Sequence, residues 1–473
     1  MTTRSIWRAL GCTGLSALLL LAIPVAASAT PSTGRGLSSN TRFFVPPPGA
    51  GPLQQAIQLA THGDLKDASL LGKMVLTPQA VWLNGGTPAQ VERQVQTTMF
   101  EAAIQHSVPV FVAYDIPFRD CGQYSAGGAQ NTTAYEAWIN GLAAGLGGGH
   151  AVVLLEPDGL GIIPYNTDIN GHAESCQPSL TGTGLTPTTA KAARYTQLNY
   201  AVSQLEAQPN VGVYLDGTHP AWLGVGDIAQ RLVKAGVQQA QGFFVNVSNY
   251  QYTVNSADYG TWISDCIAYA TTVDPGNFLG CPNQYWNGGA ADGYVGTALT
   301  PYAAWSATAN YTTELDQWTG GINANYAGLL GTAVPTTHFV VDTSRNGQGP
   351  NNMSTYGNAP YNQSAATVSS LVNGNWCNNP AAGLGPTPTA NTGVPLLDAY
   401  LWVKTPGQSD GQCDAAGGAR AWDYSIYTRP AWPTDTADQA LFDPLWGLND
   451  PAAGAWFPQL TLSLIKKANP ALG

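Results

Sequence analysis

The most regular feature of the sequence is a set of short segments that are apolar at every position and end in an acidic residue. In the clearest of them, residues 152–155 are apolar and Glu156-Pro157-Asp158 follows directly. Such a run is typical of a strand buried on both faces, and Pro157 ends it because proline has no amide hydrogen for the ladder. Similar runs end in Asp115, Asp216 and Asp342. Because barrel and open α/β proteins keep their active sites at the carboxyl ends of strands, we expect these acids to line one cleft.

Segments with helical periodicity alternate with these runs from about residue 54 onward. This β-α-β order predicts right-handed crossovers and a parallel sheet. About seven strands with acids at their ends favour a distorted parallel β/α barrel over an open doubly wound sheet. Thr132 or Thr133 can cap the helix that follows them. The predicted helices are residues 87–103, 133–146, 189–207 and 226–240, and the predicted strands are residues 108–115, 151–156, 211–216, 242–247, 338–342 and 397–403.

The beginning of the chain predicts export. Arg4 and Arg8 precede an apolar stretch over residues 15–26, and Ala27-Ser28-Ala29 follows it. This is the pattern of a secretory signal peptide over residues 1–29; the stretch is shorter than the ~20 residues that a membrane anchor needs. Residues 30–50, rich in Ser, Thr, Gly and Pro, are predicted to be a flexible lead-in. Residues 51–473 are predicted to form a single catalytic domain.

Two segments of this domain are predicted to be loops. Residues 250–335 are interpreted as an irregular insertion rich in Asn, Gly, Tyr and Trp, and residues 405–440 as a second loop region. Long ordered loops on a barrel usually build functional walls.

Charge and cysteine content narrow the class of protein. Charged residues make up 10% of the chain and the net charge is −11, which argues against nucleic acid as a partner. No G-x-G-x-x-G or G-x-x-x-x-G-K-[ST] motif supports nucleotide binding. We expect a secreted monomer with no membrane partner. Besides Cys12 in the predicted signal there are six cysteines, which favour disulfides and allow 15 pairings. Closeness in sequence favours Cys266–Cys281 and Cys377–Cys413, which leaves Cys121–Cys176.

A pair of carboxylates stands out near two strand ends. Asp120 follows the strand that ends at Asp115, and Asp158 follows the next strand. A bond between Cys121 and Cys176 would tie their loops together, and two close carboxylates raise one pKa. An acid protonated near neutral pH suits glycoside hydrolysis. For any single Asp, helix capping or pairing with a neighbouring Arg remains the more common role.

Several segments resemble glycoside hydrolase family 6, the inverting cellulases. Tyr114-Asp115-Ile116-Pro117-Phe118-Arg119-Asp120-Cys121 is similar to the first signature of that family, and Leu155-Glu156-Pro157-Asp158 to the second. The resemblance implies a distorted parallel barrel that hydrolyses the β-1,4-glucosidic bonds of cellulose and cello-oligosaccharides with inversion. We expect no cofactor and no metal. Further matching blocks are residues 214–224, 246–250, 338–347, 376–378, 391–393, 398–404, 409–411, 455–457 and 468–470.

The same resemblance assigns roles to residues. Asp158 corresponds to the catalytic acid, Asp120 to the neighbour that raises its pKa and steers water, and Asp410 to the proposed base. Disulfides Cys121–Cys176 and Cys377–Cys413 fit the family, whereas Cys266–Cys281 is additional. For Trp222 and Trp376, core packing is the alternative to stacking on sugar. The predicted substrate-binding residues are Trp82, Tyr114, Ser125, Asp216, His219, Trp222, Asn249, Trp376, Lys404 and Gln408.

Three departures from the family pattern bear on how the substrate is attacked. Gln408 stands where many members have Glu, Val225 where exo-acting fungal members have Trp, and the span from Asp410 to Cys413 is short. The last two favour an open cleft and endo attack. The 250–335 insertion favours exo attack instead, because it could cover part of the cleft. We therefore expect endo action, with an exo-acting cellobiohydrolase as the alternative.

Two alternatives from other classes are considered. A non-catalytic glucan-binding barrel is disfavoured because the three aspartates are retained together. A metal-dependent hydrolase that uses Asp216, His219 and Asp342 lacks a dense His cluster.

Overall fold

The computed structural model describes residues 35–285 and 297–472, and the predicted signal peptide lies outside them. Its centre is one parallel sheet in which seven strands pair in sequence order. The sheet curls, and the amide of Ala80 donates to the carbonyl of Trp402 at 2.9 Å, which brings the start of the first strand to the end of the last. The predicted distorted parallel barrel is confirmed. The strands are β1 Val81–Leu83, β2 Val110–Ala113, β3 Ala151–Leu155, β4 Val211–Asp216, β5 Gly242–Val245, β6 His338–Asp342 and β7 Leu397–Leu401.

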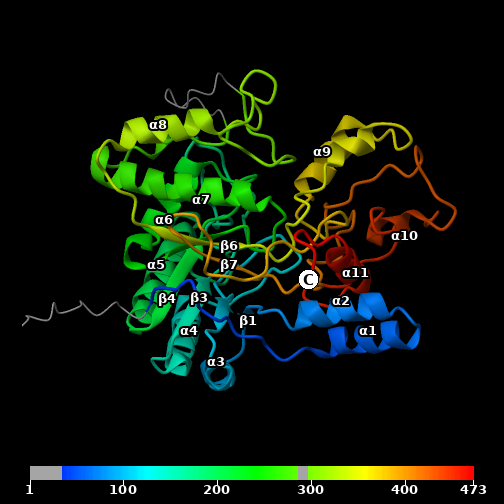
Figure 1. The fold of residues 1–473 in the computed structure, drawn as a ribbon. Helices are drawn as coiled ribbons and strands as arrows, with labels where there is room; N and C mark the ends of the chain where they lie inside the picture. Colours follow the sequence, from blue (N-terminus) through cyan, green and yellow to red (C-terminus); the bar gives the residue numbers. More distant parts are fainter. Residues whose placement is uncertain (1–34, 286–296, 473) are drawn as a thin grey trace, which may run out of the picture. The chain divides into compact units, whose positions relative to one another are not determined.

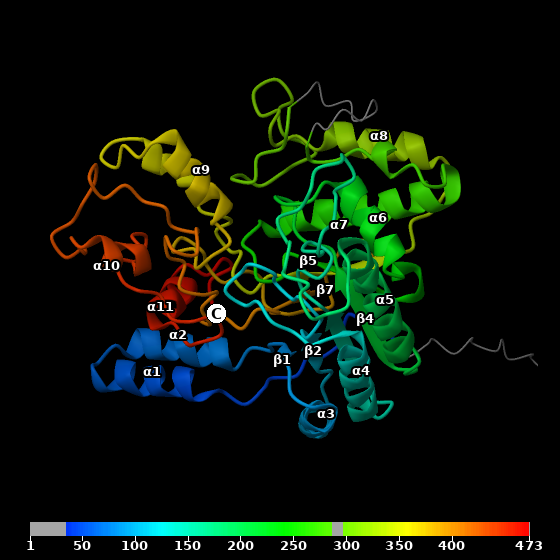
Figure 2. The same cartoon turned by 180° about the vertical axis from the view of Figure 1, so that it is seen from behind.

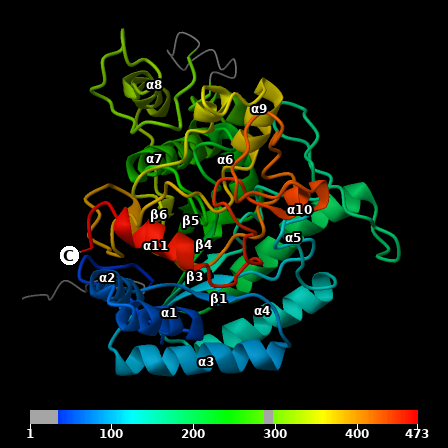
Figure 3. The ribbon, with the colours of Figure 1, turned by 90° about the vertical axis from the view of Figure 1, so that its right-hand side faces the viewer.

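Helices surround the strands. Figure 3 shows α3 to α7 around the sheet, and Figures 1 and 2 show α1, α2 and α11 together on one side. The described helices are α1 Ala50–Thr61, α2 Leu65–Val75, α3 Pro88–Ile104, α4 Thr132–Leu146, α5 Pro187–Glu206, α6 Val225–Lys234, α7 Thr253–Ala268, α8 Gly320–Leu330, α9 Ala365–Asn373, α10 Thr436–Leu441 and α11 Pro458–Lys466. None of the helices in this described part is long and apolar enough to cross a membrane.

The apolar strand pattern is explained by two cores on opposite faces of the sheet. In β3, Val153 and Leu155 pack with the helices, whereas Val152 and Leu154 point into the barrel with Tyr214 of β4. Because successive side chains of a strand alternate between faces, a strand buried on both sides needs an apolar residue at every position.

Several local predictions need correction. The cap of α4 is Asn131, whose side chain accepts from the amide of Ala134 at 2.9 Å, rather than Thr132 or Thr133. The segment 250–335 is not wholly irregular, because it contains α7 and α8. Helix α7 is buried around much of its circumference and includes buried polar residues, so it lacks an amphipathic pattern. Strand β1 was not predicted as an element, since three residues are too few for a periodicity.

Three disulfides and one packed segment fasten the loops. The predicted bonds Cys121–Cys176, Cys266–Cys281 and Cys377–Cys413 are all present. Within the predicted lead-in, Phe43 forms a bridge with Val108 and is buried, so this part of the segment packs against the barrel.

Candidate active site

A cleft of about 970 Å³ lies at the carboxyl ends of the strands. Pro301 and Tyr302, which precede α8, contribute to its wall, as do Asn375 and Trp376, which follow α9. Figure 1 shows α8 and α9 above the sheet, with α8 on the left and α9 on the right of the view. Of the predicted site residues, those that line the cleft are Trp82, Tyr114, Asp120, Ser125, Asp158, His219, Trp222, Asn249, Trp376, Lys404, Gln408 and Asp410.

The turn after β3 fixes the position of Asp158. Both Glu156 and Asp158 have positive φ, at 57° and 61°, a backbone conformation that is costly for side chains of this kind. The buried Glu156 carboxylate accepts from the amides of Asp115 and Ile116 at 3.0 Å, which ties the turn to the end of β2. Such strained turns persist where surrounding bonds hold them, and here they direct Asp158 into the cleft.

Asp120 is a buried carboxylate with two hydroxyl donors. The Tyr114 hydroxyl donates to its Oδ2, and the Ser125 hydroxyl donates to the same oxygen at 2.6 Å. The disulfide of the adjacent Cys121 anchors this loop to Cys176. Burial raises the pKa of Asp120, and the two hydroxyl groups limit the rise because they stabilise the charged form.

Asp158 differs from Asp120 in having no hydroxyl donor in the part of the chain that the structure describes. Its pKa is raised well above the ordinary value by burial, then by the charges of Asp120 and Asp216. Among the described residues, no hydrogen-bond donor reaches its carboxyl group, whereas Asp120 has two. Of the two acids, Asp158 therefore holds its proton more strongly, because hydroxyl donors stabilise the charged form of Asp120 alone.

Asp410 is held as an ionised carboxylate. Its Oδ2 lies 2.9 Å from Arg345 Nη1 and accepts from the Tyr250 hydroxyl at 3.1 Å and the Asn378 amide at 2.9 Å. Its Oδ1 lies 3.2 Å from Lys404 Nζ. Burial raises the pKa of Asp410, but the charges of Arg345 and Lys404 outweigh burial and hold the pKa below its ordinary value. Oδ1 has the fewer contacts of the two oxygens.

The other strand-end acids do not share the cleft. Asp216 accepts from the amides of Leu160 and Gly161 at 3.1 Å each, so it fixes the turn beyond Asp158 from behind. Asp342 accepts from the amides of four residues, namely Ser248, Ser344, Val403 and Lys404. The expectation of one cleft lined by all four acids is therefore wrong, because backbone amides bind two of them.

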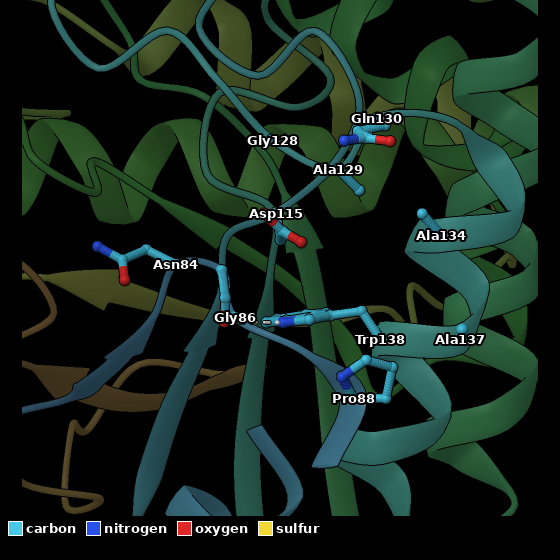
Figure 4. A pocket seen from close by; sticks show the side chains of 11 residues that line it. Asn84, Gly86, Pro88, Asp115, Gly128, Ala129, Gln130, Ala134, Ala137 and Trp138 are labelled. Carbon is cyan, nitrogen blue, oxygen red and sulfur yellow. Dashed lines mark hydrogen bonds between the residues drawn. The ribbon is translucent and has the colours of Figure 1, made fainter. Parts of the chain in front are cut away.

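Asp115 faces a different hollow. This second pocket, of about 490 Å³, lies beside the beginning of α4, and Figure 4 shows the Asp115 side chain pointing into it between Gly86 and Ala129. Burial raises the pKa of Asp115 to about 6. Asn84 lines both this pocket and the cleft.

Aromatic side chains provide the apolar part of the cleft. Trp82 meets the Tyr114 ring edge-on at 5.2 Å between centroids, and Trp376 lies 6.0 Å from Tyr124. The Trp222 ring lies against Gly161, where an added Cβ would come within 2.3 Å of the indole. Each of these tryptophans is partly exposed, which distinguishes them from the buried Trp402.

The three residues of the metal-hydrolase alternative do not form a metal site in the described part of the chain. Asp216 and Asp342 bond backbone amides, and burial lowers the pKa of His219 to about 3. The described acids and cysteines contain one group with ligand atoms within 4.8 Å of one another, Cys413, Asp443 and Asp450. Cys413 belongs to a disulfide and therefore offers no thiolate.

Comparison with known proteins identifies the family. The sequence matches Glycosyl hydrolases family 6 over residues 38–468. The chain belongs to this family. It is 31% identical over 362 residues to Endoglucanase 1 of Streptomyces sp. (strain KSM-9), which covers 76% of this chain and 71% of the relative. It is 29% identical over 385 residues to the probable 1,4-beta-D-glucan cellobiohydrolase C of Neosartorya fischeri, covering 76% of this chain and 62% of the relative.

A solved structure of the family has the same fold. The endoglucanase Cel6 from Mycobacterium tuberculosis, in complex with methyl-cellobiosyl-4-deoxy-4-thio-beta-D-cellobioside, is 26% identical with a TM-score of 0.55. The alignment covers 91% of this chain and 98% of that one.

Sequence reasoning gave no role to three residues that hold Asp410. Tyr250, Arg345 and Asn378 all lie inside segments that resemble the family. Their places in those segments could have marked them as site residues. Only the tertiary structure shows that all three contact the same carboxylate.

Proposed function

We propose that this glycoside hydrolase is a secreted β-1,4-glucanase that cleaves cellulose and related β-glucans with inversion. The single observation that carries the proposal is the contrast between two cleft carboxyl groups. The pKa of Asp158 is raised well above its ordinary value and no donor among the described residues reaches its carboxyl group, whereas the charges of Arg345 and Lys404 lower the pKa of Asp410. Inversion requires one acid and one carboxylate on opposite faces of the sugar.

In the proposed reaction, Asp158 donates its proton to the glycosidic oxygen as the bond to the anomeric carbon breaks. A water molecule attacks the opposite face of the ring, and its proton passes to Asp410 directly or through another water. Asp120 carries negative charge beside the developing positive charge of the ring. It also raises the pKa of Asp158, so it keeps the acid protonated.

The proposed substrate is a glucan chain that lies along the cleft. The faces of Trp82, Trp222 and Trp376 pack against the C–H faces of glucose rings. Lys404, Asn249, His219 and Gln408 bind hydroxyl groups. Asp216 does not contact the substrate but stabilises the turn that follows Asp158.

Endo attack is the favoured mode. Val225 is fully buried at the beginning of α6, so it offers no stacking surface at the position where exo-acting members carry Trp. The turn from Asp410 to Cys413 is short and is fastened by the bond to Cys377. Exo action remains the second candidate because Pro301 and Tyr302 from the insertion line the cleft.

Product analysis tests the proposal. Cellohexaose cleaved by the enzyme should release α anomers first in NMR spectra, and carboxymethylcellulose should lose viscosity quickly relative to the number of reducing ends formed. A β product would refute inversion. Release of cellobiose with little loss of viscosity would establish exo attack instead, and binding without turnover would indicate a non-catalytic barrel.

A further inference from the structure

Two buried acids lie behind the loop that carries Asp410. Asp443 is fully buried and Asp450 is 5% exposed. Their carboxyl oxygens lie within 4.8 Å of each other and of the Cys413 sulfur. Neither residue lines the cleft.

Each acid has one bonded oxygen and one without a partner. Asp443 Oδ1 accepts from Arg420 Nε at 3.1 Å and from the Leu445 amide at 2.8 Å, and Asp450 Oδ2 accepts from Asn378 Nδ2 at 2.8 Å. Asp443 Oδ2 and Asp450 Oδ1 are buried with no hydrogen-bond partner. Two buried oxygens without donors are costly, and a single proton between them provides the missing hydrogen bond.

We propose that Asp443 and Asp450 share one proton, and that this acid pair positions Asp410 through Asn378. The proton belongs to Asp450, which donates it to Asp443 Oδ2. Arg420 decides this assignment, because its guanidinium pairs directly with Asp443, whereas its charge lowers the pKa of Asp450 only as a minor influence. Burial and the charge of Asp443 raise the pKa of Asp450 to about 9, in agreement with this assignment.

Asn378 connects the acid pair to the cleft. Its side chain donates to Asp450, and its Oδ1 accepts from the Asp410 amide at 2.8 Å. Its own amide donates to Asp410 Oδ2 at 2.9 Å. Asn378 has a positive φ of 37°, so its conformation depends on these bonds. A change at Asp450 therefore reaches Asp410 without any contact with substrate, which makes Asp450 a positioning residue.

A bound cation is the alternative explanation for two facing carboxyl groups. Arg420 already supplies one positive charge, and its other nitrogens donate to the carbonyls of Gly374, Cys377 and Ala419. The nearby Cys413 is disulfide-bonded. Tyr356 and Tyr424, which also interact with the charge of Asp443, keep their protons because burial raises both pKa values. The charge of the group is therefore balanced with one proton and without a metal.

Thermal unfolding of three variants tests the shared proton. Asp450→Asn replaces the acid by an amide that can donate to Asp443 and accept from Asn378, so its Tm at pH 7 should stay close to that of the wild type. Asp450→Ala and Asp443→Asn should both lower the Tm, the second because it leaves Arg420 buried without a carboxylate. An Asp450→Asn variant as unstable as Asp450→Ala would overturn the proposal. So would a wild-type Tm that falls in EDTA and recovers with Ca²⁺.

Linkage gives a second readout of stability. The folded protein keeps the Asp450 proton up to about pH 9, whereas an unfolded Asp loses it near pH 3.9, so stability falls as the pH rises between these values. In Asp450→Asn, the slope of the unfolding free energy against pH should correspond to about one proton fewer than in the wild type. An unchanged slope would contradict a protonated Asp450.

The catalytic half of the inference rests on the role proposed for Asp410. Asp450→Ala should lower kcat about ten- to a hundredfold with little change in KM, since a misplacement of about 1 Å can cost about 10²-fold. Asp450→Asn should keep kcat at pH 7 near that of the wild type. The wild type should lose kcat above about pH 9, and Asp450→Asn should not show that loss. If the stability results hold and kcat does not respond, the acid pair is real but does not position Asp410; the role of Asp410 itself is tested separately by Arg345→Gln.

Discussion

Arg345 and Asp410 form an ion pair with 2.9 Å between Nη1 and Oδ2, and the side chains are about 1% and 5% exposed. The pair is remote in sequence, and Arg345 also lies 4.3 Å above the ring of Tyr250, whose hydroxyl donates to the same carboxylate. Breaking one partner of a buried pair leaves an uncompensated charge, so this contact serves both the position of Asp410 and its ionised state.

Arg345→Gln should lower the free energy of unfolding by about 3–5 kcal/mol. Urea denaturation at pH 7 measures this. Arg93→Gln, at an exposed arginine, is the matched control and should change stability by less than about 0.5 kcal/mol. Equal stabilities of the two variants would show that the pair contributes nothing.

The same pair predicts the response to acid. Because the folded-state pKa of Asp410 is lowered, its contribution is complete above the unfolded value of about 3.9 and is lost as the pH falls through the folded-state pKa. In Arg345→Gln that pKa rises, so the acid limb of kcat should move to higher pH. A pH–rate profile from pH 3 to 7 measures the shift, and an unmoved limb would contradict the role of Asp410.

Asp158→Ala should lower kcat on cellohexaose by about 10²–10⁴-fold, the usual contribution of a general acid. Cleavage of 2,4-dinitrophenyl cellobioside should be far less affected, because that leaving group departs without a proton. Binding of cello-oligosaccharides, measured by calorimetry, should persist. The same loss on both substrates would mean that Asp158 is not the acid.

The disulfides should differ in their effect on activity. Replacing Cys121 and Cys176 with Ala opens a loop of 55 residues and should cost about 4 kcal/mol of stability, against about 3 kcal/mol for the 15-residue loop of Cys266 and Cys281. Only the first pair adjoins Asp120, so only its removal should lower kcat in the protein that remains folded. Comparable kcat losses for both double variants would show that neither disulfide affects activity through Asp120 and Asp158.

Substitutions of Trp376 and Trp402 should distinguish a tryptophan that binds substrate from one that packs in a core. Trp376→Ala should raise KM for cello-oligosaccharides roughly two- to tenfold, equivalent to about 0.5–1.5 kcal/mol, with little loss of stability. Trp402→Ala should instead destabilise the fold by about 3–5 kcal/mol, because this indole is 1% exposed and packs in a core. Steady-state kinetics and thermal unfolding of both variants measure the contrast; a stable Trp402→Ala variant with a raised KM would reverse the assignment.

The barrel could be predicted from the sequence largely because parallel strands covered on both faces must be apolar at every position, as in β3. Helix α7 could not, since its buried Asn255 and Ser256 break any apolar stripe. Strand β1 was too short to carry a pattern, although its Trp82 was recognised from the family resemblance.

For the site, the sequence by itself determined the residue types and their order: acids after apolar strands, six cysteines beyond the predicted signal, and motif segments typical of one hydrolase family. Only the tertiary structure decided which acids serve the cleft. A parallel sheet brings all strand ends to one edge, but the backbone of the last turn and the nearby amides set where each carboxyl group points. Asp158 faces the cleft from a turn with positive φ, whereas Asp216 and Asp342 are bound by amides. The same holds for the pairing of Asp410 with Arg345 and of Asp443 with Asp450, because charges and protons respond to neighbours in space and not along the chain.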